Sequence, residues 1–235
     1  MAGQPHSARL ALEDAGRSDS SGQKRRSAAL RAGGRLAHAL SERVGYVLAG
    51  GQARRLGEDK ARAQLVGGVT LLAWVTERLS PAVASWTAVG AKAGEYEDLG
   101  VRTIGDRWPG QGPLGGIATA AIDRGRGWFF VTSCDAVWAR AAWVEQLWEA
   151  RRSPAVVFEH QGRLEPLFGW YRAELAPDLE AAMEGGQRSV WRFLEAVGAR
   201  RLDAPGEWES GQGINDPQAL ARARAKAQKI LRGDR

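Results

Sequence analysis

Hydrophobic residues follow two alternating periods along most of the chain. Runs of strand type occupy residues 44–50, 85–90, 101–106, 127–135, 154–160 and 164–171. Segments with apolar residues at helical spacing stand among them, over residues 70–79, 112–125, 139–150, 187–197 and 217–231. Strands that alternate with helices at short spacing are typical of a mostly parallel sheet with helices on both faces. We therefore predict an α/β fold, a Rossmann-like three-layer sandwich.

Single residues refine this pattern. The run over 127–135 is apolar along most of its length, which predicts a central strand. The segment over 164–171 is the candidate for an antiparallel strand. Thr70 is a suitable N-cap for the helix that follows it. The helix over 112–125 opens with a Gly-Pro pair and closes near Gly125, as helix starts and ends commonly do.

The first 43 residues differ in composition from the rest of the chain. They are rich in Ser, Gly, Arg and Ala and contain almost no large apolar side chains. We predict that residues 1–43 form a disordered basic extension, within which residues 35–43 could form a short helix. Residues 44–235 then form one domain, with no internal repeat.

The formal net charge of +6 is concentrated at the two ends of the chain. Residues 1–43 carry +4 and residues 221–235 carry +5, whereas residues 44–220 carry −3. The middle of the chain has no basic surplus that would coat a duplex. We interpret the basic ends as solvated and expect no nucleic-acid partner.

Several classes of protein are disfavoured by what the sequence lacks. It has no apolar run of about 18 residues for a membrane span, and the charged stretch after Arg25-Arg26 is unlike the apolar core of a signal peptide. The single cysteine, Cys134, cannot form a disulfide within the chain, which fits the reducing cytoplasm, and we interpret it as core filler. The three histidines supply a zinc site or a His-based dyad poorly. We expect a cytoplasmic protein that spans no membrane.

The candidate chemistry lies where strands end, because ligands of parallel α/β sheets bind beyond the carboxyl ends of the strands. The loop after the first strand contains paired glycines and three basic residues: Ala49, Gly50, Gly51, Arg54, Arg55 and Lys60. Glycine N–H groups can face an anion, and the basic side chains suit phosphate oxygens. The loop therefore predicts a polyphosphate site; the alternative is a plain strand-to-helix turn. Because Ala61 follows Lys60, it is not a Walker A loop, and it is not a G-x-G-x-x-G loop either.

Two carboxylates follow later strands. Asp106 ends the third strand and Asp135 ends the central one. We expect them at neighbouring strand ends, where they would hold Mg²⁺ opposite the phosphate loop. Each alone could instead be a helix cap or a solvated turn. The glycine-rich turn over 112–116 lies between them and could let a flat base lie against backbone, or serve only as a helix entry.

The stretch LAGGQARRLGEDKA, residues 48–61, resembles the signature of nucleotidyltransferases of the molybdenum cofactor guanylyltransferase (MobA-type) family. The segments GPLGGI, SCD, EPLFGWY, GGQRSVWRFL and INDPQAL follow in that family's order. The resemblance covers Val44 to about Leu220. It implies a nucleotidyltransferase-type fold and transfer of GMP from GTP to molybdenum-bound molybdopterin, with Mg²⁺ as cofactor and pyrophosphate as the second product.

The resemblance also implies roles for single residues. Arg55, Lys60 and Asp135 would be catalytic, with Asp135 also the Mg²⁺ ligand and the two basic residues neutralising the triphosphate. Nucleotide and acceptor contacts would come from Leu48, Ala49, Gly50, Gly51, Lys60, Asp106, Gly112, Pro113, Leu114, Gly115 and, on the molybdopterin side, Asn215.

Two departures from the family pattern and several alternatives remain. Val137 stands where the family tends to have Pro, and residues 88–92 lack the Asn that some members carry near the ribose. One alternative is a sister nucleotidyltransferase that uses CTP as the nucleotide or acts on another phosphorylated acceptor, because such an enzyme shares the loop after the first strand. A non-catalytic protein that chaperones the cofactor is the rival from another class. Trp138, three residues past Asp135, either stacks on the pterin ring or anchors the next helix.

Overall fold

The computed structural model describes residues 40, 42–50, 56–208 and 213–232. The chain divides into two units, Met1–Ala39 and Leu40–Arg235. The first unit lies outside the described residues, and so does most of the predicted extension over 1–43 with its short helix over 35–43. The description below concerns the second unit.

A seven-stranded sheet organises this unit, in the order β5-β4-β1-β6-β8-β7-β9. Its strands are β1 Val44–Leu48, β4 Ser85–Gly90, β5 Arg102–Gly105, β6 Trp128–Ser133, β7 Ala155–His160, β8 Arg163–Arg172 and β9 Arg200–Asp203. Strand β8 runs antiparallel to β6 and β7, and the other pairs are parallel. The mostly parallel sheet, the antiparallel strand and the central place of β6 are thus confirmed.

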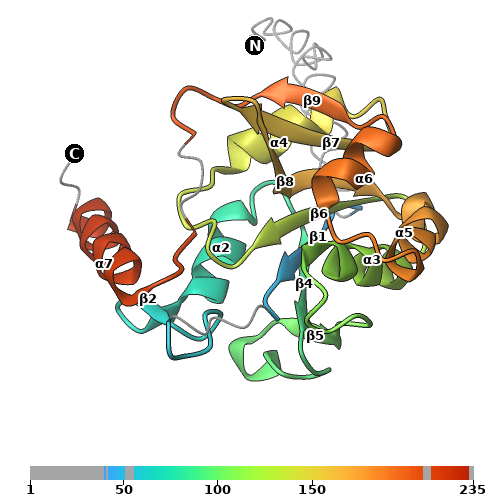
Figure 1. Cartoon of the computed structure of the whole chain (residues 1–235). Coiled ribbons are helices and arrows are strands. Elements are labelled where there is room, and N and C mark those ends of the chain that lie inside the picture. The colour runs from blue at the N-terminus through green and yellow to red at the C-terminus, as the bar shows by residue number, and fades with distance from the viewer. Residues whose placement is uncertain (1–39, 41, 51–55, 209–212, 233–235) are drawn as a thin grey trace, which may run out of the picture. The chain divides into compact units, whose positions relative to one another are not determined.

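The helices form the two outer layers (Figure 1). One core receives residues from α2 Leu71–Leu79, α4 Ala141–Ala150 and α7 Pro217–Arg232, and the other from α3 Pro113–Arg124, α5 Ala176–Glu184 and α6 Val190–Ala196. Strand β6 contributes to both, because Phe130 belongs to the first core and Phe129 to the second, as the alternation of side chains along a strand requires. The predicted three-layer sandwich is confirmed.

Local signals act as expected at two helix starts. The Thr70 hydroxyl accepts a hydrogen bond from the Ala73 N–H at 3.2 Å, which caps α2. Helix α3 begins at Pro113, after Gly112 at φ 89°, a conformation that favours glycine. Short elements that the hydrophobic pattern did not indicate are the β2–β3 hairpin, Gln64–Val66 and Val69–Thr70, the 3₁₀ turns η1 Glu97–Leu99 and η2 Ala173–Leu175, helix α5 and strand β9.

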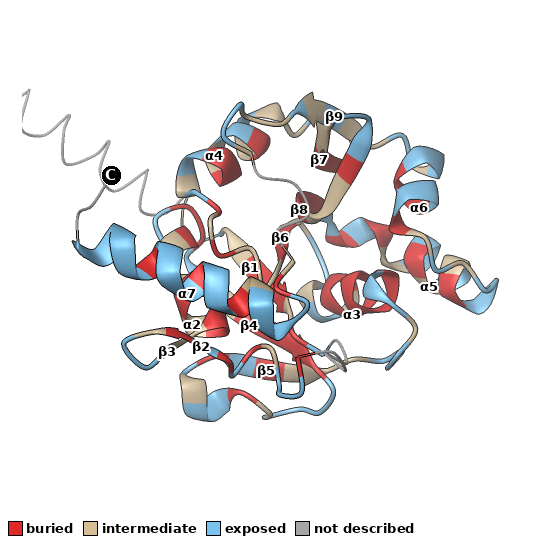
Figure 2. Ribbon diagram, turned by 60° about the vertical axis from the view of Figure 1, so that its left-hand side comes forward, coloured by how far each residue is buried: buried red, intermediate tan, exposed pale blue. Residues whose placement is uncertain are grey.

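Burial follows the layers, as Figure 2 shows: buried positions gather in the strands and on the inner faces of the helices, and α7 is largely exposed.

Cys134 is buried, as expected. Desolvation is the larger cause, and the nearby Asp135 charge the second, that raises the pKa of its thiol to about 12. This thiol stays protonated at neutral pH and is unsuited to act as a nucleophile. Of the helices that the structure describes, none is both long and apolar enough to cross a membrane.

Candidate active site

Three side chains that are far apart in sequence meet beyond the carboxyl ends of β1 and β6. The Lys60 ammonium donates to Asp135 Oδ2 at 3.0 Å and to Asn215 Oδ1 at 2.9 Å. The side chains of Lys60 and Asp135 are only 16% and 15% exposed, so their interaction is less screened than a surface ion pair. All three residues were named from the sequence, and the structure brings them together.

Asp135 is held by the sharp turn at the end of β6. The Ser133 hydroxyl donates to Asp135 Oδ1, so both carboxylate oxygens have a partner. The Ala136 N–H donates to the Ser133 carbonyl, which closes the turn. Val137, the departure from the family pattern, is fully buried, and its carbonyl accepts from the Trp74 indole at 2.9 Å. Packing and this hydrogen bond therefore anchor the loop without a proline.

Gly213 lets the last segment approach this centre. A Cβ built on Gly213 would lie 2.6 Å from Asn215 Nδ2 and 3.2 Å from Asp135 Oδ2. Only glycine fits without a shift of a site side chain. No local sequence signal marks Gly213, because its role depends on a contact with Asp135, far away in the chain.

Hydrogen bonds fix the residues on both sides of Lys60. Asp59 Oδ1 accepts from the Ala61 N–H at 2.9 Å and from the Tyr96 hydroxyl at 3.3 Å. The Tyr96 hydroxyl is also 3.4 Å from the Ala49 carbonyl, which links this segment to the loop after β1. Arg62 forms a bidentate pair with Asp98. Tyr96 thus joins the segment around Lys60 to the loop after β1, through contacts that no local sequence pattern predicts.

The described part of the predicted phosphate loop packs against β4. The N–H groups of Ala49 and Gly50 both donate to the Val89 carbonyl, at 2.9 and 3.1 Å. They are not directed at an anion, so the expectation that the Gly50 amide contributes to an anion nest is wrong for this structure. A Cβ on Gly50 would lie 3.2 Å from the Gly90 backbone, so this glycine serves close packing. The other loop residues named from the sequence lie outside the described residues: Gly51, Arg54 and Arg55.

Asp106 shapes the turn from β5 to α3. Its Oδ1 accepts from the Trp108 N–H and from the Thr119 hydroxyl, both at 3.0 Å. The expectation that Asp106 and Asp135 follow neighbouring strands is wrong, because β4 and β1 lie between β5 and β6. Three strand spacings separate the strand ends by roughly 14 Å. The two carboxylates are therefore not placed to ligate one ion together.

The glycine-rich turn at the start of α3 packs closely on its surroundings. A Cβ on Gly115 would lie 2.9 Å from Trp108 Cβ, and one on Gly116 would lie 3.0 Å from Leu48 Cδ2. The glycines thus allow the helix to approach β1, with Leu114 fully buried. That they also border a guanine base stays a prediction.

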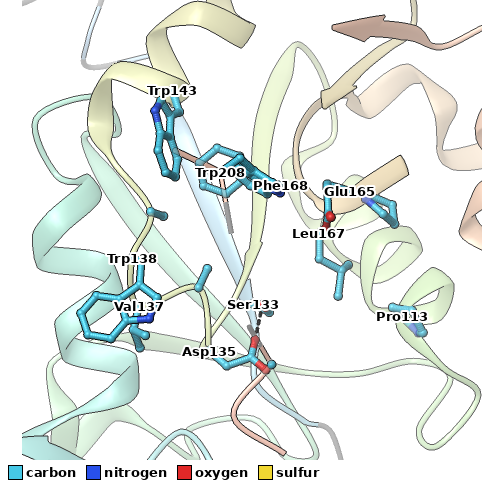
Figure 3. A pocket seen from close by; sticks show the side chains of 14 residues that line it. Pro113, Ser133, Asp135, Val137, Trp138, Trp143, Glu165, Leu167, Phe168 and Trp208 are labelled. Carbon is cyan, nitrogen blue, oxygen red and sulfur yellow. Dashed lines mark hydrogen bonds between the residues drawn. The ribbon is translucent and has the colours of Figure 1, made fainter. Parts of the chain in front are cut away.

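A cavity of about 280 Å³ opens beside Asp135 (Figure 3). Its walls are mostly apolar and aromatic; they are formed by Pro113, Ser133, Asp135, Ala136, Val137, Trp138, Ala139, Trp143, Glu165, Pro166, Leu167, Phe168, Trp208 and Gly213. Trp138 thus lines the cavity, and the Lys226 ammonium lies 4.3 Å from the centre of its ring. We call this space the aromatic cavity.

Comparison with known proteins identifies the family. The family model described as MobA-like NTP transferase domain matches residues 45–202. A molybdenum cofactor guanylyltransferase of Serratia proteamaculans is 32% identical over 179 residues, which cover 74% of this chain and 90% of that protein. The molybdenum cofactor guanylyltransferase of Cereibacter sphaeroides is also 32% identical, over 79% of this chain and 97% of its own length.

Comparison with solved structures supports the same family. The molybdopterin-guanine dinucleotide biosynthesis protein A of Archaeoglobus fulgidus is 28% identical with a TM-score of 0.67, and the match covers 80% of this chain and 99% of that one. The 2-C-methyl-D-erythritol 4-phosphate cytidylyltransferase of Thermus thermophilus, 17% identical with a TM-score of 0.57 over 78% and 98% of the two chains, shares the fold alone. By its sequence and its sheet, the chain belongs to the MobA-like NTP transferase family.

Proposed function

We propose that the chain transfers GMP from GTP to molybdenum-bound molybdopterin and releases pyrophosphate. The observation that carries the proposal is the meeting of Lys60, Asp135 and Asn215 beyond the ends of β1 and β6, in a nucleotidyltransferase whose relatives at 32% identity are named molybdenum cofactor guanylyltransferases. The site provides charge and hydrogen bonds rather than a nucleophile, which suits direct transfer between two phosphorylated reactants.

The reaction balances without a covalent enzyme intermediate. An oxygen of the terminal phosphate of molybdopterin attacks the α-phosphorus of GTP and forms the new P–O bond. The bond from the α-phosphorus to the bridging oxygen breaks, and pyrophosphate leaves with that electron pair. Lys60 would neutralise the charge that grows on the pyrophosphate, and Asn215 would hold Lys60 in place.

The residues present fit Mg²⁺. One carboxylate oxygen of Asp135 and the amide oxygen of Asn215 converge on a single cation, the Lys60 ammonium. Mg²⁺ prefers oxygen ligands and is usually held by one or two carboxylates together with phosphate oxygens. In the described residues no three His, Cys, Asp or Glu side chains cluster to hold a metal by themselves, so substrate phosphates would complete the shell. Bound beside Asp135, the ion would stabilise charge on the transferring phosphate.

Nucleotide choice is the open alternative. The cytidylyltransferase neighbour is only 17% identical, whereas the guanylyltransferase relatives are 32% identical, which supports GTP over CTP. The test is pyrophosphate release with each of the four NTPs, with and without molybdenum-loaded molybdopterin. We expect pyrophosphate release with GTP, and only when molybdenum-loaded molybdopterin is present. Release with CTP instead would favour the sister enzyme, and no release with any NTP would favour a cofactor chaperone.

A further inference from the structure

The aromatic cavity adjoins the proposed site but differs from it in chemistry. It shares Ser133, Asp135 and Gly213 with the site. In Figure 3 Asp135 and Ser133 lie at one end, and Trp143, Trp208 and Phe168 gather at the other. Within the described part of its lining there is no Lys or Arg, and the charged groups are the two carboxylates of Asp135 and Glu165. Such a space suits a flat, uncharged ring that carries N–H donors, and it disfavours a phosphate.

Two polar groups in the cavity have unused hydrogen-bonding capacity. The Trp208 indole nitrogen is buried and has no hydrogen-bond partner of normal geometry among the described residues. Glu165 is half-buried in the same wall, and the Trp208 indole is its neighbour there, close enough to influence the carboxylate but not in a hydrogen bond of normal geometry. Burial raises the pKa of the Glu165 carboxyl, and the nearby Trp208 indole opposes that rise. A donor and an acceptor therefore lie close together in the wall, and a ligand would satisfy both.

An irregularity in β8 places side chains of this strand in the cavity wall. In the pairing with β7 the register jumps, because Val157 pairs with Gly169 and the next residue, Phe158, pairs with Glu165. The residues between, Pro166 to Phe168, have no partner in the ladder with β7, although Phe168 still pairs with Thr132 of β6, and the Pro166 carbonyl accepts from the Tyr171 hydroxyl at 2.6 Å. Bulges next to active sites commonly re-aim side chains. Here the bulge brings Glu165 and Leu167 into the cavity lining.

The order of the strands indicates which reactant the cavity faces. Lys60 comes after β1, Asp135 follows β6, and Glu165 lies on β8, so β6 stands between the other two strands. The triphosphate requires the basic side, and the two reactants must approach the transferred phosphorus from opposite sides. The cavity on the β8 side is therefore on the side of the acceptor.

We propose that the aromatic cavity binds the pterin ring of the acceptor, with Glu165 accepting from the ring N3–H and 2-amino groups and the Trp208 indole donating to the neighbouring ring carbonyl. A carboxylate accepts two parallel N–H donors in a fork-like arrangement. Trp143, Phe168 and Trp208 provide an aromatic wall whose ring centres are 5.1 to 6.5 Å apart. This inference rests on the proposed function, because that function supplies the pterin.

The test compares two ring compounds and two pairs of variants. Pterin and lumazine differ in that lumazine carries a carbonyl in place of the 2-amino donor. Glu165→Gln is matched with Glu207→Gln, an exposed carboxylate paired with Arg140 outside the cavity. Trp208→Phe is matched with Trp191→Phe, whose ring is exposed on α6. Melting temperatures of all four variants show whether each is folded.

We expect Glu165→Gln to raise the KM for molybdopterin about tenfold or more while the KM for GTP stays unchanged. Trp208→Phe should raise the same KM several-fold, and the two control variants should match the wild type. Pterin should inhibit competitively with the acceptor and more strongly than lumazine, and Glu165→Gln should remove that difference.

Three results would overturn the assignment: an unchanged acceptor KM in Glu165→Gln, equal or absent inhibition by the two compounds, or competition of pterin with GTP. The last would make the cavity the guanine site, since guanine presents a similar edge. Direct binding, followed by pterin fluorescence, separates this inference from the proposed function. If no NTP releases pyrophosphate but pterin binds the wild type and not Glu165→Gln, the function fails and the cavity assignment stands.

Discussion

Replacing Gly213 by alanine should impair catalysis without weakening the fold. The new Cβ would lie 2.6 Å from Asn215 Nδ2. That atom is the end of a side chain, so rotation of Asn215 relieves the clash, but the rotation removes the 2.9 Å hydrogen bond from Lys60. A hydrogen bond to a charged group contributes about 1.5–3 kcal/mol, which corresponds to roughly a 10- to 150-fold loss of kcat/KM.

The assay is pyrophosphate release, with Gly206→Ala as the matched control. Gly206 lies on the same connection after β9, and a Cβ there would meet nothing within 4 Å. We expect Gly206→Ala to keep the wild-type rate and both variants to melt within a few degrees of the wild type. A wild-type rate in Gly213→Ala would show that the Asn215 contact does not matter. A large fall in its melting temperature would show that Gly213 is needed for folding instead.

Four further predictions concern the site and the ends of the chain. Asp135→Asn should reduce turnover roughly a hundredfold or more with little change in melting temperature, because the amide is a poor Mg²⁺ ligand; near-normal activity at low Mg²⁺ would contradict the metal assignment. Lys60→Ala should lower kcat as well as raise the KM for GTP, since pyrophosphate gains charge as it leaves; an unchanged kcat would mean that Lys60 only binds. Deletion of residues 1–42 should leave turnover and melting temperature unchanged, and a fall of more than about 4 °C would show that the segment docks. Trp138→Ala should raise the KM for molybdopterin alone if the ring stacks on the pterin; a lower melting temperature with both substrates affected would identify Trp138 as a packing residue under Lys226.

The elements with strong periodicity could be predicted from the sequence, and those defined by long-range pairing could not. Strand β4 spans the predicted residues 85–90, because an apolar run bounded by turn residues carries its own signal. Strand β9, Arg200–Asp203, has alternating exposed residues and depends on its pairing with β7. Helix α5 begins beside Pro177 and buries only Leu179 and Met183, so its local pattern is weak.

One missed element did carry a local signal. The β2–β3 hairpin turns through Gly67 and Gly68, at φ 59° and 82°. Paired glycines between β-branched residues are a hairpin signature, because two-residue hairpin turns favour positive φ at both positions. The segment VGGVT therefore could have been recognised as a turn.

The candidate site was predictable where a strand end determines it. Asp135 was found because the polar residue after an apolar strand of a parallel sheet faces the ligand edge. The same rule misplaced Asp106, because the order of strands in the sheet is not encoded in the segments themselves. Gly213 and Tyr96 were missed for a related reason: their contacts join residues that the sequence separates widely.

The strand order that separates Asp106 from Asp135 also explains why transfer would occur at the end of β6. Going across the sheet from β1 to β8, Lys60 follows the first strand, Asp135 the second, and Glu165 belongs to the third. A basic side suits the triphosphate and an acidic, aromatic side suits a donor-bearing ring. Asp135 lies between these two sides, and the Lys60 ammonium is 3.0 Å from its carboxylate. Because Asp135 lies between these two unlike surfaces, a Mg²⁺ ion held beside it would meet the reacting phosphates of both substrates.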